Sequence, residues 1–267
     1  MSVVHSSRCV LQQRDRRLLV DLYGHKVLSR DHFIELGHFK SVARCNARLL
    51  RLRQGGFIKL LRHPAWGSSS ASHYMLSGKA IAVIAEALDR PPSEVARQIN
   101  AKPALLYLEH TLLLANLRCL FTKALASKRT PFTWLPEGLC LHRYQVGLDA
   151  RVIKPDSFVR WGVDDQVQNW LIELDLGHAS LPALRRKLEN YANYFADGAC
   201  HDAYGRGRFG ILFITTGERR VRAILDVLTT YPALKGYVVS QSSLVLSPFE
   251  TDWQSVSGPV SLMEAMA

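Results

Sequence analysis

The chain has 267 residues and a formal net charge of +11 at pH 7, and this length accommodates two modest domains with a core each. The positive excess lies at the start, because residues 1–102 hold 17 Lys and Arg against 7 Asp and Glu, whereas residues 103–267 hold 17 against 16. A basic module joined to a near-neutral one indicates an anionic partner for the first, most often nucleic acid; a basic surface kept for solubility is the alternative.

The cysteine pattern and the apolar pattern argue against a zinc-binding or disulfide-rich protein and against a membrane protein. The five cysteines form no CxxC pair and no metal-ligand spacing, so reduced thiols are expected in place of a zinc site or a disulfide framework. The start of the chain has no signal pattern, and the most apolar segment, residues 104–125, is interrupted by Glu109, His110, Asn116 and Arg118. A buried core helix, no membrane partner and a cytoplasmic location are therefore predicted.

Three short helices are predicted in residues 14–25, 30–37 and 40–56, with Ser29 as the N-cap of the second. On the third helix, at 100° per residue, apolar and basic residues fall on nearly opposite faces. The apolar face consists of Val42, Cys45, Leu49 and Leu52, and the basic face of Lys40, Arg44, Arg48 and Arg51. A helix with one apolar face packed on the core and one basic face turned outward is suited to bind a negatively charged partner.

Two strand-like runs, residues 57–62 and 72–76, follow and flank a loop of Pro, Gly and Ser. Three helices and then a β-hairpin are the order of a winged helix-turn-helix, whose third helix enters the major groove of DNA. Residues 1–88 are therefore predicted to be a DNA-binding domain of this kind; a protein–protein module with a solvated basic face is the alternative. The DNA-binding candidates are Lys40, Ser41, Arg44, Arg48, Arg51, Lys59 and Arg62.

Residues 89–103 begin with a Pro-Pro break and are predicted to be a linker. From residue 104 to 247 the pattern predicts a helix, three strands, a helix and a strand, followed by one more helix and strand. This order is the skeleton of the restriction-endonuclease-like, or PD-(D/E)XK nuclease-like, α/β sandwich with a mixed sheet, so the fold class is α/β (α+β over the whole chain). Residues 248–267 are expected to form a C-terminal tail without a recognisable function.

Acidic residues in this domain occur where such a fold would hold a metal ion. Asp156 follows Pro155 on one predicted core strand, and Glu173 lies on the next. Neighbouring strands are about 4.8 Å apart, so two carboxylates can share one Mg²⁺. Alternation along the strand places Glu173 and Asp175 on the same face. Asp156 and Glu173 are the predicted metal ligands, with Mg²⁺ as the cofactor and Mn²⁺ as its substitute.

Lys187, on the helix predicted at residues 180–195, completes the predicted catalytic group of Asp156, Glu173, Asp175 and Lys187. The usual pattern has a lysine where Asp175 stands, and that lysine orients the attacking water and offsets negative charge in the transition state. Lys187 shares a helical stripe with Leu184 and Tyr191, so it can replace that lysine from the helix. The alternative is a lysine that extends from the edge of the core or simply pairs with one of the acids.

The segments "RDRRLLVDLYGHKVLSRDHF", "KPDSFVRW", "NWLIELDLGHASLPALRRKLENYANYF" and "FGILFITTGERRVRAIL" together resemble the replication-relaxation family of bacterial plasmids and other mobile elements. The resemblance is most specific in the PD, ELD and KLxNY segments, which match the family motif at Asp156, Glu173, Asp175, Lys187 and Tyr191. It implies a winged helix followed by a restriction-endonuclease-like domain, and a part in plasmid or mobile-element DNA replication, relaxation or transfer.

Two functions stay open at this level. In one, a DNA-binding protein of a plasmid or mobile element uses its nuclease-like domain to cleave phosphodiesters with Mg²⁺. In the other, the protein is a non-catalytic transcriptional or replication regulator whose nuclease-like domain is a scaffold or dimerisation platform. Double-stranded DNA is the expected partner in both, and a homodimer and other replication or mobilisation proteins are further candidates.

Arg219 and Arg220 are expected either to contact a DNA backbone or to form a solvated helix start.

Overall fold

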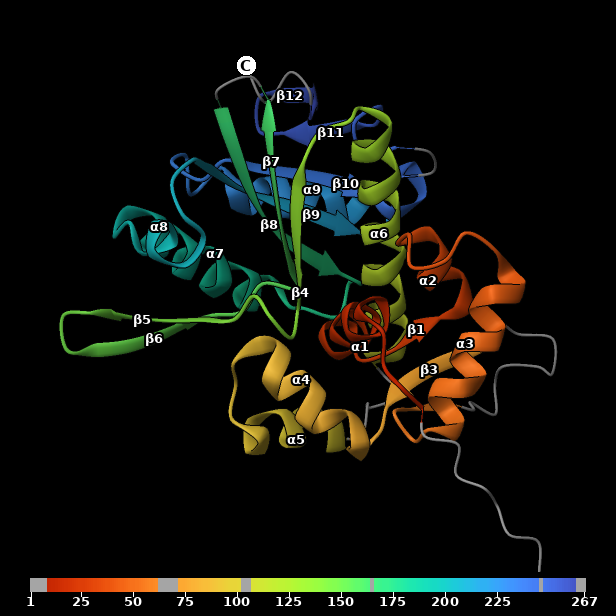
Figure 1. Ribbon diagram of the computed structural model, residues 1–267. Helices are drawn as coiled ribbons and strands as arrows, with labels where there is room; N and C mark the ends of the chain where they lie inside the picture. Colours follow the sequence, from red (N-terminus) through yellow and green to blue (C-terminus); the bar gives the residue numbers. More distant parts are fainter. Residues whose placement is uncertain (1–8, 62–71, 102–106, 164–165, 245–246, 263–267) are drawn as a thin grey trace, which may run out of the picture. The chain divides into compact units, whose positions relative to one another are not determined.

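The computed structural model describes residues 9–61, 72–101, 107–163, 166–244 and 247–262. The chain divides into two compact units, Met1–Cys119 and Leu120–Ala267. The division falls inside one helix, α6 (Leu108–Ser127). Figure 1 labels the elements of both units, and each unit is described by itself below.

The N-terminal unit contains short helices and a small sheet. Its elements are α1 (Gln13–His25), β1 (Leu28–Ser29), α2 (Arg30–Glu35), α3 (Val42–Gln54), β2 (Ile58–Leu61), β3 (His73–Leu76), the 3-10 turn η1 (Gly78–Ala80), α4 (Ile81–Leu88) and α5 (Pro92–Asn100). The strands lie in the order β1-β3-β2, and β2 and β3 form an antiparallel hairpin. Three helices followed by a hairpin are thus present in the predicted order. The loop of this hairpin, with Arg62, lies outside the described residues.

The local sequence explains where these helices begin and what they bury. The Ser29 hydroxyl accepts the His32 N–H at 3.2 Å, which confirms the predicted cap of α2, and Ser41 caps α3 through the Arg44 N–H. The segment predicted as a linker contains α5, which packs on α4. On α3 the predicted core residues Cys45, Leu49 and Leu52 are buried, whereas Val42 is 48% exposed. Val42 is the first residue of the helix, so it lies at the edge of the packed face.

The C-terminal unit is built on a mixed sheet with the strand order β12-β11-β10-β9-β8-β7-β4. Its strands are β4 (Phe132–Pro136), β7 (Ser157–Val163), β8 (Gln166–Asp175), β9 (Arg208–Thr215), β10 (Gly236–Ser240), β11 (Asp252–Ser255) and β12 (Gly258–Ser261). Strands β4, β7 and β8 form an antiparallel meander, and β9 and β10 continue it in parallel. Because parallel neighbours need a crossover, α7 (Leu181–Ala196) and α8 (Ala199–Tyr204) connect β8 to β9, and α9 (Glu218–Leu228) connects β9 to β10.

This topology contains the predicted order of helix, three strands, helix and strand, in α6, β4, β7, β8, α7 and β9. The structure adds a separate two-stranded hairpin, β5 (His142–Val146) and β6 (Asp149–Ile153), between β4 and β7. The predicted strand across "VIKPDSFVRW" is therefore two strands, interrupted at residues 154–156. The segment predicted as a tail contributes β11 and β12 to one edge of the sheet. The short 3-10 turn η3 (Gln241–Ser243) follows β10 and precedes this segment.

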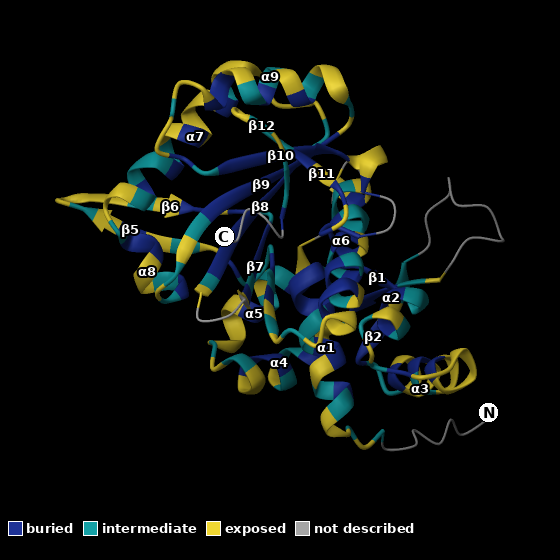
Figure 2. Cartoon of the chain, turned by 90° about the horizontal axis from the view of Figure 1, so that it is seen from above, coloured by how far each residue is buried: buried dark blue, intermediate teal, exposed yellow. Residues whose placement is uncertain are grey.

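Helices cover both faces of this sheet. On one face α7 and α9 bury a cluster that includes Leu188, Tyr191 and Phe213, and on the other Phe121 of α6 packs against Trp134 and Trp161. Figure 2 shows the central strands buried and the outer sides of α7 and α9 exposed. Strand β8 is buried from Gln168 to Leu174 because it has neighbours on both edges and helices on both faces. None of the described helices is long and apolar enough to cross a membrane.

Candidate functional site

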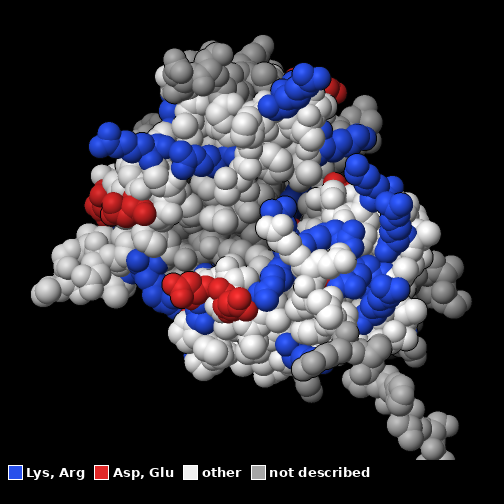
Figure 3. All heavy atoms as spheres, in the orientation of Figure 1, with Lys and Arg blue, Asp and Glu red and all other residues white. Residues whose placement is uncertain are grey.

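Exposed basic side chains of the N-terminal unit form one group of predicted site residues. Lys40, Arg44, Arg51 and Lys59 are all exposed, and within the described residues none of their side chains makes an ion pair. In Figure 3 Lys and Arg gather closely at the right of the view, where Figure 1 draws α2 and α3. Such unpaired surface charges are suited to phosphate contacts, which position a protein on DNA. The Ser41 hydroxyl is instead used as the cap of α3.

Arg48 differs from the other predicted DNA-binding residues. Its Nε donates to Asp15 Oδ1 at 2.9 Å, its Nη2 donates to Asp15 Oδ2, and the same Nη2 donates to the Val10 carbonyl oxygen at 2.7 Å. The Asp15 side chain is completely buried and that of Arg48 is 11% exposed. This bidentate pair joins α1 to α3 and holds the Arg48 guanidinium against the buried Asp15 carboxylate, away from the solvent-exposed face of the helix. Local sequence patterns do not predict this pair, because the partners are 33 residues apart.

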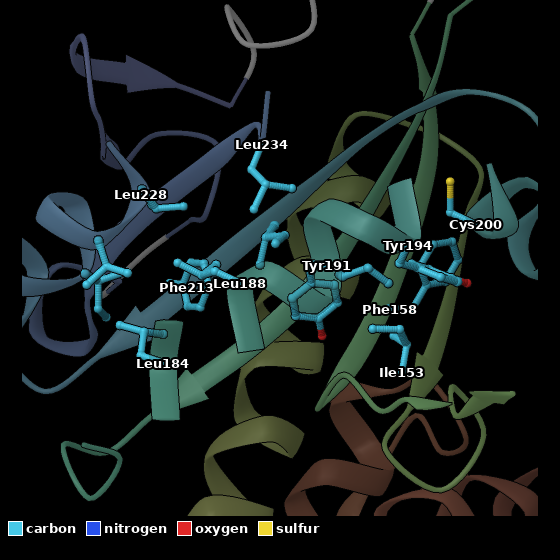
Figure 4. Close-up of a cluster of buried hydrophobic side chains, with 14 of the residues drawn as sticks. Ile153, Phe158, Leu184, Leu188, Tyr191, Tyr194, Cys200, Phe213, Leu228 and Leu234 are labelled. Carbon is cyan, nitrogen blue, oxygen red and sulfur yellow. The ribbon is translucent and has the colours of Figure 1, made fainter. Parts of the chain in front are cut away.

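The second group of predicted residues surrounds Glu173 in the C-terminal unit. The Tyr191 hydroxyl donates to Glu173 Oε1, and the Lys187 ammonium donates to Glu173 Oε2. Glu173 lies on β8, and its two partners lie one helical turn apart on α7, the helix that covers this face of the sheet. Figure 4 shows Tyr191 among the buried side chains between α7 and the strands. The structure thus brings Glu173, Lys187 and Tyr191 together.

Asp156 approaches the same place from the turn before β7. Its N–H donates to the Ile172 carbonyl at 3.0 Å, and its Oδ2 accepts the Leu174 N–H at 2.8 Å. These two bonds hold the Asp156 carboxylate beside the strand segment that carries Glu173. Burial raises the pKa of Glu173 to about 7, with the Lys187 charge opposing this shift and the Asp156 charge adding to it. The two carboxylates therefore interact electrostatically.

Lys187 connects this buried acid to the surface. Its side chain is 42% exposed although its ammonium contacts Glu173, which is 3% exposed. Burial acts to lower the pKa of Lys187, but the charges of Glu173, Asp156 and Asp175 outweigh it and raise the pKa. The lysine consequently stays protonated at neutral pH. A positive charge is thus fixed beside two carboxylates at a point that solvent reaches.

Asp175 is held by a different partner. Arg220 of α9 donates to Asp175 Oδ2 from Nε at 2.9 Å and from Nη2 at 2.6 Å, and the Gly177 N–H donates to Oδ1 at 2.8 Å. For Arg220 the sequence predicted either a DNA contact or a solvated helix start, and the pair with Asp175 was not predicted. The fold produces this pair, because parallel β9 pairs Thr215 with Asp175, and the chain enters α9 only a few residues later.

The carboxylates present fit Mg²⁺ in number and chemistry. Within the described part of the chain no group of three or more His, Cys, Asp or Glu side chains is placed to hold a metal ion. Mg²⁺, however, is commonly held by one or two carboxylates together with waters and substrate phosphates. An ionised carboxylate has about four acceptor positions, so Glu173 can accept from Lys187 and Tyr191 and still offer lone pairs. Asp156 and Glu173 are the residues that would hold the ion.

The molecule thus combines a basic helical unit with an α/β unit in which two carboxylates and a lysine gather near the end of β8. Residues 19–208 match the replication-relaxation family, and the chain belongs to this family. No curated protein matches its sequence.

Two solved structures resemble the chain weakly. One is the restriction endonuclease FokI, with 12% identity and a TM-score of 0.34 over 86% of this chain and 42% of that one. The other is FokI bound to DNA, with 14% identity and a TM-score of 0.31 over 91% of this chain and 45% of that one. The chain spans less than half the length of these structures. Family membership therefore rests on the sequence match.

Proposed function

We propose that this protein binds double-stranded DNA of a plasmid or another mobile element and that its C-terminal unit cleaves a phosphodiester bond of that DNA with Mg²⁺. The observation that carries the proposal is the contact of the Lys187 ammonium with buried Glu173, beside Asp156. Family membership supports a part in plasmid replication, relaxation or transfer. A cytoplasmic location belongs to the proposal and is supported by five cysteines that are all free thiols.

Each residue of the group has a role that follows from its surroundings. Asp156 and Glu173 would hold Mg²⁺ together with phosphate oxygens of the substrate, and the bound ion supplies Lewis-acid activation of the phosphate. Lys187 stays protonated and offsets the negative charge that develops on the attacked phosphate. Tyr191 fixes the orientation of the Glu173 carboxylate through its hydroxyl. Asp175, bound by Arg220, holds the start of α9 to the end of β8.

The test is cleavage of supercoiled plasmid in Mg²⁺ and, separately, in Mn²⁺. We expect nicking by the wild type and a loss of about 10²-fold or more in Glu173→Gln and in Lys187→Ala. The matched controls are Glu189→Gln on the exposed side of α7 and Lys123→Ala on the exposed side of α6, which should nick like the wild type. Melting temperatures of all variants show whether the fold is retained. A wild type that shifts the plasmid in a gel but never cuts it would contradict the catalytic proposal.

A second candidate is a DNA-binding regulator whose C-terminal unit has no catalytic role. Both Glu173 oxygens already accept hydrogen bonds and Asp175 is bound by Arg220, which favours a charge network that joins strands to helices. The two candidates differ in their response to metal. The catalytic protein should be stabilised by Mg²⁺ or Mn²⁺ and lose this in Asp156→Ala, whereas the regulator should melt at the same temperature with and without metal.

A further inference from the structure

The outward face of α3 is a strip of uncharged residues. Cys45, Leu49 and Leu52 define the buried face of the helix, and at 100° per residue the opposite face carries other positions. These are Ala43, Ala47, Leu50 and Gln54, here called the outward strip, and all four are exposed. At a rise of 1.5 Å per residue the strip is about 16 Å long. The part of α3 that points furthest from the core is therefore apolar or neutral.

Charged and amide side chains border the outward strip on both sides. Arg44 and Arg51 lie on one side, and Asn46 and Arg53 lie on the other. The helix contains no acidic residue. Beside the second border lies a hollow of about 300 Å³ whose lining includes Arg30, Asn46 and Arg53. Positive charge thus runs along both edges of a neutral strip.

This arrangement is complementary to the major groove of DNA. The groove is about 12 Å wide and admits a helix, with phosphates along both rims. Arginines on the two borders can contact the two rims, whereas the strip between them faces the base edges. Alanine and leucine side chains there cannot accept or donate hydrogen bonds, but they can contact the C5-methyl group of thymine. Asn46, next to the strip, has the amide that pairs with N6 and N7 of adenine.

We infer that α3 reads A·T base pairs, with Ala43, Ala47 and Leu50 against thymine methyl groups and Asn46 bound to adenine. Arg44, Arg51 and Arg53 contact phosphates and carry no sequence information. The inference rests on the proposed DNA binding and adds the class of sequence that is bound. A protein partner for the strip is disfavoured, because arginines on both sides of it would need acidic residues on both sides of that partner's contact face.

The experiment begins with selection of bound duplexes from a random pool, which we expect to yield a core of consecutive A·T pairs. The selected duplex is then compared with one in which deoxyuridine replaces thymidine, a change that removes only the C5-methyl group. We expect a loss of about fourfold in affinity for each contacted methyl group. In Leu50→Ala this loss should shrink, because one of the contacting side chains is shorter.

A second arm tests the adenine contact. Replacing adenine with 7-deazaadenine removes N7 and should weaken binding by the wild type about tenfold. Asn46→Ala should bind normal and 7-deaza duplexes equally, whereas the matched control Asn100→Ala on α5 should behave like the wild type. Asn46 and Asn100 are exposed, so neither substitution disturbs the core.

The outcomes separate this inference from the proposed function. Enrichment of A·T cores with sensitivity to deoxyuridine supports the inference. Tight binding of selected duplexes with equal affinity for thymidine and deoxyuridine overturns it and leaves DNA binding intact. A selection that enriches no duplex at all, together with no gel shift on plasmid, overturns DNA binding itself and the inference with it.

Discussion

The charged side chains of the two units lie in opposite surroundings. Arg44 and Arg51 of α3 are exposed and free of ion pairs within the described residues, whereas Glu173 is 3% exposed and accepts from both Lys187 and Tyr191. An exposed charge attracts a partner at long range and is screened by salt. A buried charge has a fixed position and a shifted pKa, as Glu173 does. Exposed charges are therefore suited to binding a charged partner, and buried charges are suited to catalysis or to stabilising the fold.

Arg48 shows that surroundings and not residue type decide between these two behaviours. It lies on the same helix as Arg44 and Arg51, yet it is paired with fully buried Asp15. The Arg48–Asp15 salt bridge resembles the Glu173 group because its carboxylate is buried, although it lies in the basic N-terminal unit. The comparison therefore predicts that neighbouring arginines of α3 respond to substitution in different ways.

The largest effect is expected for Arg48→Ala. Removing one partner of a buried ion pair leaves an uncompensated charge on Asp15, which costs about 3–5 kcal/mol of unfolding free energy. Urea denaturation followed by circular dichroism measures this loss. Arg44→Ala, on the same helix but exposed, should stay within about 0.5 kcal/mol of the wild type. If Arg48→Ala were as stable as Arg44→Ala, the buried pair would not stabilise the unit.

The double variant Arg44→Ala/Arg51→Ala should weaken DNA binding without loss of stability. Two lost phosphate contacts reduce the slope of log K against log salt by about two and cost about 2.5 kcal/mol of binding at 0.1 M salt. Fluorescence anisotropy over a range of salt concentrations gives both quantities. An unchanged slope would remove these arginines from the DNA interface. As a control, Lys123→Ala on the exposed side of α6 should keep the wild-type slope.

A pH effect follows from His25 in the N-terminal unit. Burial lowers the pKa of His25 to about 3, with the Arg118 charge adding to the shift, whereas the unfolded chain takes up the proton near pH 6.5. The neutral buried ring therefore gives full stability above about pH 6.5, and stability falls as the pH drops towards 3. Between pH 7 and pH 5 the expected loss is about 2 kcal/mol.

His25→Leu should remove this part of the pH dependence. The measured quantity is the difference in unfolding free energy between pH 7 and pH 5, which should be about 2 kcal/mol smaller than in the wild type. His178→Leu, at an exposed position, serves as the matched control and should leave the difference unchanged. Equal pH dependence in both variants would contradict the burial of a neutral His25.

The smallest effect is expected for Tyr191→Phe. The substitution keeps the buried ring, which is 1% exposed, and removes only the hydroxyl that donates to Glu173. Loss of a donor to a buried acceptor costs about 1.5 kcal/mol. Tyr107→Phe, where the side chain is 66% exposed, should be neutral. Stability of Tyr191→Phe equal to that of the control would mean that the hydroxyl does not support Glu173.

Periodicity predicted a large part of this molecule. Alternation along β8 and the stripe on α7 placed Glu173 and Lys187 on surfaces that face each other, and the structure joins them. The order of helices and strands was also readable, because long apolar runs separate cleanly from turns. Short elements were harder: the β5–β6 hairpin was missed, and its two strands of five residues each carry a weak pattern.

Pairs between distant segments could not be read from the sequence. Arg48 meets Asp15 across 33 residues, and Arg220 meets Asp175 across 45. Nothing in local spacing distinguishes these arginines from their exposed neighbours, because only the docking of one element on another decides which guanidinium is enclosed. Tertiary packing therefore determined the roles of individual arginines, although their presence on α3 and α9 was evident.

The position of α6 limits how the two units could be exchanged or separated. The helix starts in the N-terminal unit, where Asn116 contacts His32 and Arg118 contacts Asp21, and ends in the C-terminal unit, where Phe121 packs against Trp161. A gene fusion cut between Cys119 and Leu120 would divide one helix and expose parts of two cores. A chimera with a different N-terminal unit would need a new surface on residues 108–119 as well, so the two units cannot be exchanged as independent modules.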